Sequence, residues 1–142
     1  MFYNVYMKNV KEINFMSHGS NEDGFLTVIE NNNDFVFPIK RVYTVTDTKE
    51  GNIRGYHAHK KLWQVFFALT GSIKVTCENQ KGEIETIILD SPNKGLICGP
   101  MIWHTLEYHN SAILMVLASE KYNENDYIRE YDRFKNYENT SK

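Results

Sequence analysis

The chain has 142 residues, of which 42% are hydrophobic and 24% are charged, a composition typical of an ordinary globular domain rather than a disordered chain. Its net charge of −2 argues against binding nucleic acid or a membrane surface over a large area. The longest apolar run, residues 112–118, is too short to span a bilayer. The N-terminal residues also lack the pattern of a secretory signal. We therefore expect one domain, residues 1–142, that works in the cytoplasm.

Short β-rich runs recur along most of the chain. They cover residues 25–30, 35–46, 62–69, 72–78, 84–89, 95–98, 104–108 and 112–118. Turn-forming residues separate many of them, for example Thr70-Gly71 and the segment 91–95. Regularly spaced short strands of this kind predict an all-β sandwich or barrel.

Two of the predicted strands are apolar on both faces, and the last part of the chain changes character. Residues 62–69 and 112–118 need cover on both sides, and a subunit interface could supply the second cover. We therefore expect a homodimer. Near the C-terminus, Tyr127, Ile128, Tyr131 and Phe134 recur at helical spacing among charged residues, which predicts a short amphipathic helix that covers the barrel.

Three histidines are the main candidates for chemistry. His57 and His59 stand two residues apart, so on a strand their side chains share one face. A third histidine, His104, follows the turn at residues 99–103. Buried imidazoles need polar partners, which favours a functional site over casual burial. Cys77 and Cys98 have neither metal-ligand nor redox spacing, so we expect two buried thiols.

The histidine segment resembles the first motif of the cupins, which are small β-barrels. The matching positions are Gly51, His57, His59 and Gly71, and a second cupin motif is partly met by Gly95, Pro100 and His104. Metal-binding cupins add a glutamate to these histidines, but that position holds Trp63 or Gln64 here. Neutral Gln is a poor ligand for a hard cation, although three histidines alone could hold zinc or iron. We expect no metal and no other cofactor.

A narrower resemblance extends over nearly the whole chain, to the nucleotide-sugar 3,4-ketoisomerases. It is carried by residues 37–43 (FPIKRVY), 54–62 (RGYHAHKKL), 89–92 (LDSP), 99–104 (GPMIWH), 116–119 (VLAS) and 126–132 (DYIREYD). The resemblance implies a jelly-roll cupin dimer that converts dTDP-4-keto-6-deoxyglucose to a 3-keto-6-deoxyhexose without a metal. It also implies that a separate PLP-dependent aminotransferase consumes the product, for incorporation into O-antigen lipopolysaccharide or S-layer glycans.

The chemistry of this isomerisation assigns roles to particular residues. Moving a carbonyl from carbon 4 to carbon 3 needs a base at carbon 3 and an acid at carbon 4, and histidine can serve as either near neutral pH. By the resemblance, His57 is the base and His59 returns the proton, an order that is a hypothesis. Tyr43 could donate to the enediolate oxygen or act as the acid. The residues expected to bind the substrate are Arg41 and Arg54, for the diphosphate, together with His104, Trp103 and Gln64.

Other activities fit part of the pattern. A sugar 3,5-epimerase also removes a proton beside a ketone, a metal cupin would use the histidines as ligands, and a non-catalytic cupin would only bind a sugar. The chain also departs from the ketoisomerases at Asp23, where an arginine commonly precedes the glycine. The resemblance implies that this loop helps to set which face of the sugar is protonated, so the configuration of the product at carbon 4 stays open.

Overall fold

The structure, a computed structural model, describes residues 7–31, 35 and 37–138, and its elements are almost all β-strands. They are β1 (Val10–Asn14), β2 (Met16–Ser20), β3 (Gly24–Val28), β4 (Arg41–Val45), β5 (Ile53–His59), β6 (Gln64–Glu78), β7 (Ile84–Leu89), β8 (Lys94–Cys98), β9 (Trp103–Ala118) and β10 (Tyr127–Ile128), with the 3-10 helix η1 (Glu124–Asp126) and the α-helix α1 (Tyr131–Asn136). The predicted all-β fold with a short C-terminal helix is confirmed. No helix in the described ranges is long and apolar enough to cross a membrane.

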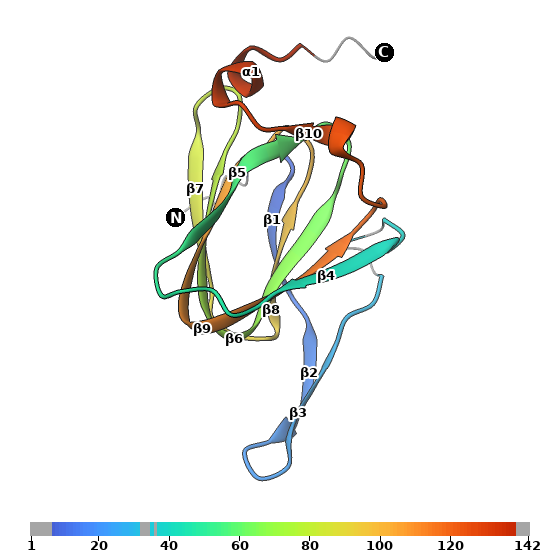
Figure 1. Ribbon diagram of the computed structural model, residues 1–142. Coiled ribbons are helices and arrows are strands. Elements are labelled where there is room, and N and C mark those ends of the chain that lie inside the picture. The colour runs from blue at the N-terminus through green and yellow to red at the C-terminus, as the bar shows by residue number, and fades with distance from the viewer. Residues whose placement is uncertain (1–6, 32–34, 36, 139–142) are drawn as a thin grey trace, which may run out of the picture.

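One antiparallel sheet of eight strands curves around the core (Figure 1). Its order is β1-β8-β6-β9-β5-β10, with β4 also paired to β9 and β7 to β6. The prediction divided the two long strands, β6 and β9, at residues 70–71 and 109–111, but each is continuous and bends there. Asn110 and Ser111 have positive φ at the bend. At Gly71 a Cβ atom would lie 2.6 Å from the carbonyl oxygen of Asn110, so only glycine lets the two strands approach this closely.

Both faces of the sheet carry apolar side chains, and each face is buried in a hydrophobic cluster of its own. The larger cluster fills the barrel and includes Phe66, Val75, Leu96 and Val116. A second cluster lies on the opposite face, where Ile13 and Phe15 pack with Val65, Phe67 and Leu117. The sequence analysis assigned the second cover to a subunit interface. The chain's own N-terminal segment supplies it at these positions.

The two ends of the chain differ from the predicted elements. Strands β1 and β2 were not predicted, and β2 pairs with β3 to form a hairpin that extends from the barrel on the side away from α1 (Figure 1). Of the strand predicted at residues 35–46, only Arg41–Val45 is a strand among the described residues. The predicted C-terminal helix begins at Tyr131. Before it, Tyr127 and Ile128 form β10 and pair with His59 and Ala58 of β5.

Candidate active site

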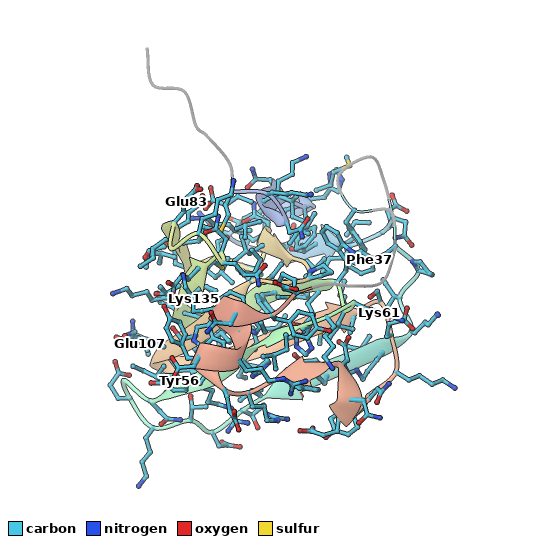
Figure 2. All side chains as sticks on the ribbon, turned by 90° about the horizontal axis from the view of Figure 1, so that it is seen from above. Phe37, Tyr56, Lys61, Glu83, Glu107 and Lys135 are labelled. Carbon is cyan, nitrogen blue, oxygen red and sulfur yellow. The ribbon has the colours of Figure 1, made fainter. Side chains whose placement is uncertain are left out.

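A cavity of about 480 Å³ opens into the barrel and contains most of the predicted site residues. Its lining consists of Arg41, Tyr43, Val45, Arg54, Gly55, Tyr56, His57, Phe66, His104, Leu106, Tyr108, Leu114, Tyr127 and Arg129. Polar and aromatic side chains therefore surround an apolar floor, as is usual for a small-molecule site. Seen from the α1 end, the C-terminal segment crosses over the barrel, so it contributes to one wall of the site (Figure 2).

An irregularity in β5 sets the position of the first histidine. The pairing of β5 with β9 shifts between Gly55 and His57, and Gly55 and Tyr56 both have positive φ. At Gly55 a Cβ atom would lie 2.6 Å from the carbonyl oxygen of His104. Glycine is therefore required for β5 to approach β9 here, and the bulge places His57 beside His104 in the register.

The structure brings the three predicted histidines into one cluster. The ring centroid of His57 lies 4.9 Å from that of His59 and 4.7 Å from that of His104. Each ring uses Nδ1 for a hydrogen bond: His57 with the carbonyl of Gly55 at 3.0 Å, and His104 with the carbonyl of Ile102 at 3.2 Å. A carbonyl can only accept, so both rings carry their proton on Nδ1 and leave Nε2 as an acceptor.

Burial keeps these imidazoles neutral. Desolvation and the neighbouring His59 lower the pKa of His57 to about 4. Burial also holds the pKa of His104 well below its usual value, with smaller contributions from His57 and His59. Near neutral pH, both rings are therefore free to accept a proton or to bind a ligand through a lone pair.

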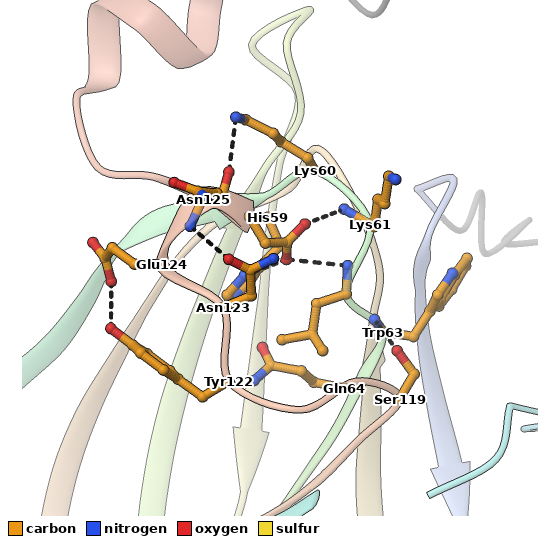
Figure 3. A network of polar contacts seen from close by, with 12 residues as sticks. His59, Lys60, Lys61, Trp63, Gln64, Ser119, Tyr122, Asn123, Glu124 and Asn125 are labelled. Carbon is orange, nitrogen blue, oxygen red and sulfur yellow. Dashed lines mark hydrogen bonds and ion pairs between the residues drawn. The ribbon is translucent and has the colours of Figure 1, made fainter. Parts of the chain in front are cut away.

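Asp126 is a site residue that the sequence analysis missed. Its carboxylate accepts a hydrogen bond from Nδ1 of His59 at 3.1 Å and from the backbone amide of Lys61 at 2.8 Å. The labelled side chains of His59 and Lys61 in Figure 3 show where this polar network lies. Burial raises the pKa of Asp126, but the bonds from His59 and the Lys61 amide lower it by more. An ionised carboxylate here fixes the tautomer and orientation of His59. No periodic signal marks this residue, because it ends a single 3-10 turn.

Tyr43 and Arg41 lie on the cavity side of β4. Tyr43 accepts a hydrogen bond of 2.6 Å from Nε2 of the buried Gln64, so its own proton is free to point elsewhere. Burial raises the pKa of Tyr43, and its hydroxyl therefore stays protonated. The guanidinium of Arg41 packs over the rings of Tyr43 and Tyr122, and its Nε atom is buried with no hydrogen-bond partner among the described residues.

The remaining predicted residues divide between the cavity and its surroundings. Arg54 lines the cavity, whereas Gln64 and His59 are not among the lining residues: Gln64 contacts the lining residue Tyr43, and His59 packs against the lining residues His57 and Tyr127. Trp103 does not line the cavity. It packs beneath α1, with its ring centroid 5.4 Å from that of Tyr131 and 5.6 Å from that of Phe134.

Tyr127 and Arg129 are two further residues that the sequence analysis did not assign to the site. The ring of Tyr127 lies against His59 at 4.4 Å and against His57 at 4.9 Å. The guanidinium of Arg129 lies over that ring at 4.2 Å and also binds both carboxylate oxygens of Glu124. Both residues were read as part of a helix, because a two-residue strand leaves no detectable pattern in the sequence.

Comparisons with known proteins agree with this geometry. The sequence matches the family described as "FdtA: WxcM-like, C-terminal" over residues 8–139. It is 49% identical, over 115 residues, to a TDP-4-oxo-6-deoxy-alpha-D-glucose-3,4-oxoisomerase from Aneurinibacillus thermoaerophilus, covering 80% of this chain and 82% of that one. The chain belongs to the FdtA family of sugar 3,4-ketoisomerases.

Solved structures support the same assignment. QdtA, a sugar 3,4-ketoisomerase from Thermoanaerobacterium thermosaccharolyticum solved in complex with TDP, has a TM-score of 0.84 and 40% identity, covering 92% of this chain and 94% of that one. A histidine-to-asparagine mutant of that enzyme was solved with TDP-4-keto-6-deoxyglucose. A dTDP-4-dehydrorhamnose 3,5-epimerase from Bacillus anthracis, with a TM-score of 0.75 and 15% identity over 87% of this chain and 80% of that one, shares the fold alone. The cupin-type fold is confirmed.

Proposed function

We propose that the protein converts TDP-4-keto-6-deoxyglucose into a TDP-linked 3-keto-6-deoxyhexose, with no metal. The observation that carries this proposal is a cavity, in a member of the ketoisomerase family, that holds neutral histidines beside a protonated tyrosine and two arginines. The ketone at carbon 4 acidifies the proton on carbon 3. A base and an acid therefore suffice, because the isomerisation moves protons and leaves the net oxidation state of the sugar unchanged.

The catalytic steps follow from the positions of the side chains. His57 lines the cavity and has a free Nε2 lone pair, so it removes the proton from carbon 3 and forms an enediolate. Tyr43 donates its proton toward the enediolate oxygen, since Gln64 already occupies its acceptor side. The proton taken by His57 then returns to carbon 4 with His59, which Asp126 holds in place, as the partner in that transfer, and the hydroxyl on carbon 3 gives its proton back to the Tyr43 oxygen as it becomes the ketone.

Two arginines support recognition of the nucleotide. Arg41 and Arg54 both line the cavity, and guanidinium groups hold diphosphate oxygens bidentately. The buried Nε atom of Arg41 lacks a partner among the described residues, and a phosphate oxygen would satisfy it. His104 forms the wall beside His57, where it orients the substrate against the base.

The reaction can be followed by proton NMR with chelator-treated protein and TDP-4-keto-6-deoxyglucose in deuterated water. We expect a 3-keto sugar to appear with deuterium at carbon 4, and its couplings report the gluco or galacto configuration. Exchange at carbons 3 and 5 with the ketone still on carbon 4 would instead indicate an epimerase. An unaltered substrate that binds would leave a non-catalytic cupin, and turnover that returns only with added metal would contradict metal independence.

His57→Asn tests the proposed base. Asparagine fills a similar volume but cannot accept the proton, so we expect turnover to fall by at least about 100-fold, as is typical for loss of a general base. Binding of TDP, measured by calorimetry, should stay within a few-fold because the arginines are intact. Near wild-type turnover in this variant would remove His57 from the mechanism.

We also propose a homodimer, in which the β2–β3 hairpin contacts the second copy. Met16, Phe25 and Leu26 on this hairpin have exposed fractions of 64%, 63% and 66%. Apolar side chains gathered on a projecting hairpin favour burial in an interface. Asp23 lies in the turn of the same hairpin and is not among the residues that line the cavity of its own chain.

A further inference from the structure

A second cavity lies beside the catalytic one, and the proposed reaction does not use it. It has a volume of about 790 Å³ and is lined by residues from the ranges 40–41, 61–62 and 120–127. Arg41 and Tyr127 line both cavities, so they stand between the two spaces. Among the described residues that line the second cavity, none is a histidine, so its chemistry differs from that of the catalytic cavity.

The lining of the second cavity carries an excess of positive charge. Its cations are Lys40, Arg41, Lys61 and Lys121, and the carboxylates of its described residues are Glu120 and Asp126. Glu120 lies 3.3 Å from the ammonium group of Lys40. The carboxylate of Asp126 already accepts from His59 and from two backbone amides. Both negative charges are therefore engaged, and three of the cations have no anionic partner among the described residues.

Several hydrogen-bond donors of this lining also lack an acceptor. The ammonium groups of Lys61 and Lys121 make no hydrogen bond or ion pair within the described ranges. Asn123 uses its amide oxygen to accept from the backbone of Asn125, so its Nδ2 group stays available to donate. The Nε atom of Arg41 is buried and unpartnered among the same residues, which is costly until an acceptor arrives. The second cavity therefore favours an anion and disfavours a cation.

A diphosphate group matches this donor set. Guanidinium groups bind phosphate oxygens through two parallel hydrogen bonds, and lysines add mobile point charges. Leu62, which is buried, and the ring of Tyr122 give the lining an apolar part as well. An organic group attached to the phosphates would pack there, since small-molecule sites combine apolar walls with a few polar groups.

We propose that the second cavity binds an organic diphosphate, separately from the substrate in the catalytic cavity, and that its occupancy weakens binding of the substrate. The weakening rests on the proposed function, in which Arg41 holds the diphosphate of the substrate. Two diphosphates on either side of Arg41 would share one guanidinium and repel each other. Binding in the second cavity does not depend on that function.

Calorimetry with inorganic pyrophosphate as the probe tests the site without measuring activity. We expect full-length protein to bind pyrophosphate in a way that survives Arg54→Gln, because Arg54 lines the catalytic cavity only. The double variant Lys61→Gln, Lys121→Gln should bind this pyrophosphate at least about tenfold more weakly, because it loses two charged donors. The control Lys49→Gln, Lys81→Gln removes the same charge at exposed positions outside both cavities and should bind as wild type does.

Two results would overturn the second site. One is an unchanged affinity for pyrophosphate in the Lys61→Gln, Lys121→Gln variant. The other is a single pyrophosphate site that Arg54→Gln abolishes as well, because both sets of residues would then belong to one continuous site.

Steady-state kinetics measure the weakening separately. Pyrophosphate should raise the KM for TDP-4-keto-6-deoxyglucose by at least about fivefold in the control variant, with little change in kcat, and by clearly less in the Lys61→Gln, Lys121→Gln variant. The same rise in both variants would disprove the coupling between the cavities. If the protein shows no turnover at all, the proposed function fails, and the calorimetry still decides whether the second cavity binds a diphosphate.

Discussion

At the residue scale, the direction of one hydrogen bond decides what Tyr43 can do. Gln64 donates to the tyrosine hydroxyl, and burial keeps that hydroxyl protonated. The spacing in the sequence placed Arg41 and Tyr43 on one face of a strand, and both line the cavity. The sequence analysis expected Gln64 to bind the substrate, whereas in the structure Gln64 contacts Tyr43 and does not line the cavity. Trp103, expected at the substrate, packs beneath α1 instead.

Tyr43→Phe removes the hydroxyl and keeps the ring. We expect kcat to fall by about 100-fold, a typical loss for one donor to an oxyanion, while the affinity for TDP changes little. The amide of Gln64 also loses its partner, so the free energy of unfolding should fall by about 1–3 kcal/mol. Steady-state kinetics and urea unfolding measure the two effects. Weaker TDP binding with unchanged kcat would make Tyr43 a binding residue.

Asp126→Asn tests the residue that positions His59. Asparagine can still accept from the backbone amide of Lys61, but it lacks the charge that stabilises a protonated His59. We expect kcat to fall by about 10- to 100-fold with a similar KM. A purely structural role would lower stability without changing the imidazole, so nitrogen-15 NMR of the His59 ring provides the second measurement. An unchanged tautomer and pH profile in a folded variant would contradict the positioning role.

At the element scale, pairing between distant strands overrides the local pattern. The turn-forming residues near positions 70 and 110 do change the direction of the chain. They bend β6 and β9 but do not end them, because pairing between these two strands resumes beyond the bend. The helical spacing around Tyr127 is equally real. Even so, Tyr127 and Ile128 become a strand because they pair with the end of β5. In both places, the strand that pairs with the segment determines its secondary structure, and the local sequence pattern does not.

The bend in β9 carries a pH-dependent contact. His109 there lies between Glu50 and Glu107, at 2.8 and 2.7 Å. Glu50, then Glu107, raises the pKa of His109 above 6.5, and His109 lowers the pKa of Glu50 below 4.5. The contribution of His109 to stability is complete below pH 6.5 and is lost as pH rises through its folded pKa. That of Glu50 is complete above pH 4.5 and is lost as pH falls.

His109→Gln should therefore lower the melting temperature most between these two values. We expect the difference from wild type to be larger near about pH 5.5 than near about pH 9, where His109 is neutral in both states. Circular dichroism melts at the two pH values measure it. The same difference at both values would show that the ion pairs contribute nothing to stability, as is common for exposed pairs.

At the scale of the whole molecule, three of the most exposed large apolar side chains among the described residues, Met16, Phe25 and Leu26, lie on the projecting β2–β3 hairpin. The N-terminal segment fills the outer face of the sheet, where a second subunit was expected. The homodimer and the single-domain organisation over residues 1–142 remain predictions. What supports the dimer is the exposed apolar surface on β2 and β3.

The double variant Phe25→Ser, Leu26→Ser tests that dimer. We expect wild-type protein to elute as a dimer in size-exclusion chromatography with light scattering, and the double variant to shift toward the monomer. Ile84→Ser, at another exposed apolar position on β7, serves as the matched control and should stay dimeric. Exposed substitutions change the folding free energy by no more than about 0.5 kcal/mol, so loss of folding should not confuse the result. A double variant that remains fully dimeric would exclude the hairpin as the contact.

The sequence alone determined the fold class, the family and the three histidines. Strand periodicity and turn residues are local properties, and the family motifs are short stretches that can be read directly. Asp126, Tyr127 and Arg129 lie in a segment that the sequence marked only as part of the family resemblance, and the tertiary structure alone added them to the site, because they reach it where the C-terminal segment crosses the barrel. The tertiary structure also decided which residues of the apolar strand β6 face the barrel interior, such as Phe66, and which face the second cluster, such as Val65 and Phe67. Long-range pairing and packing determine which side chains meet, and these contacts exist only once the chain has folded.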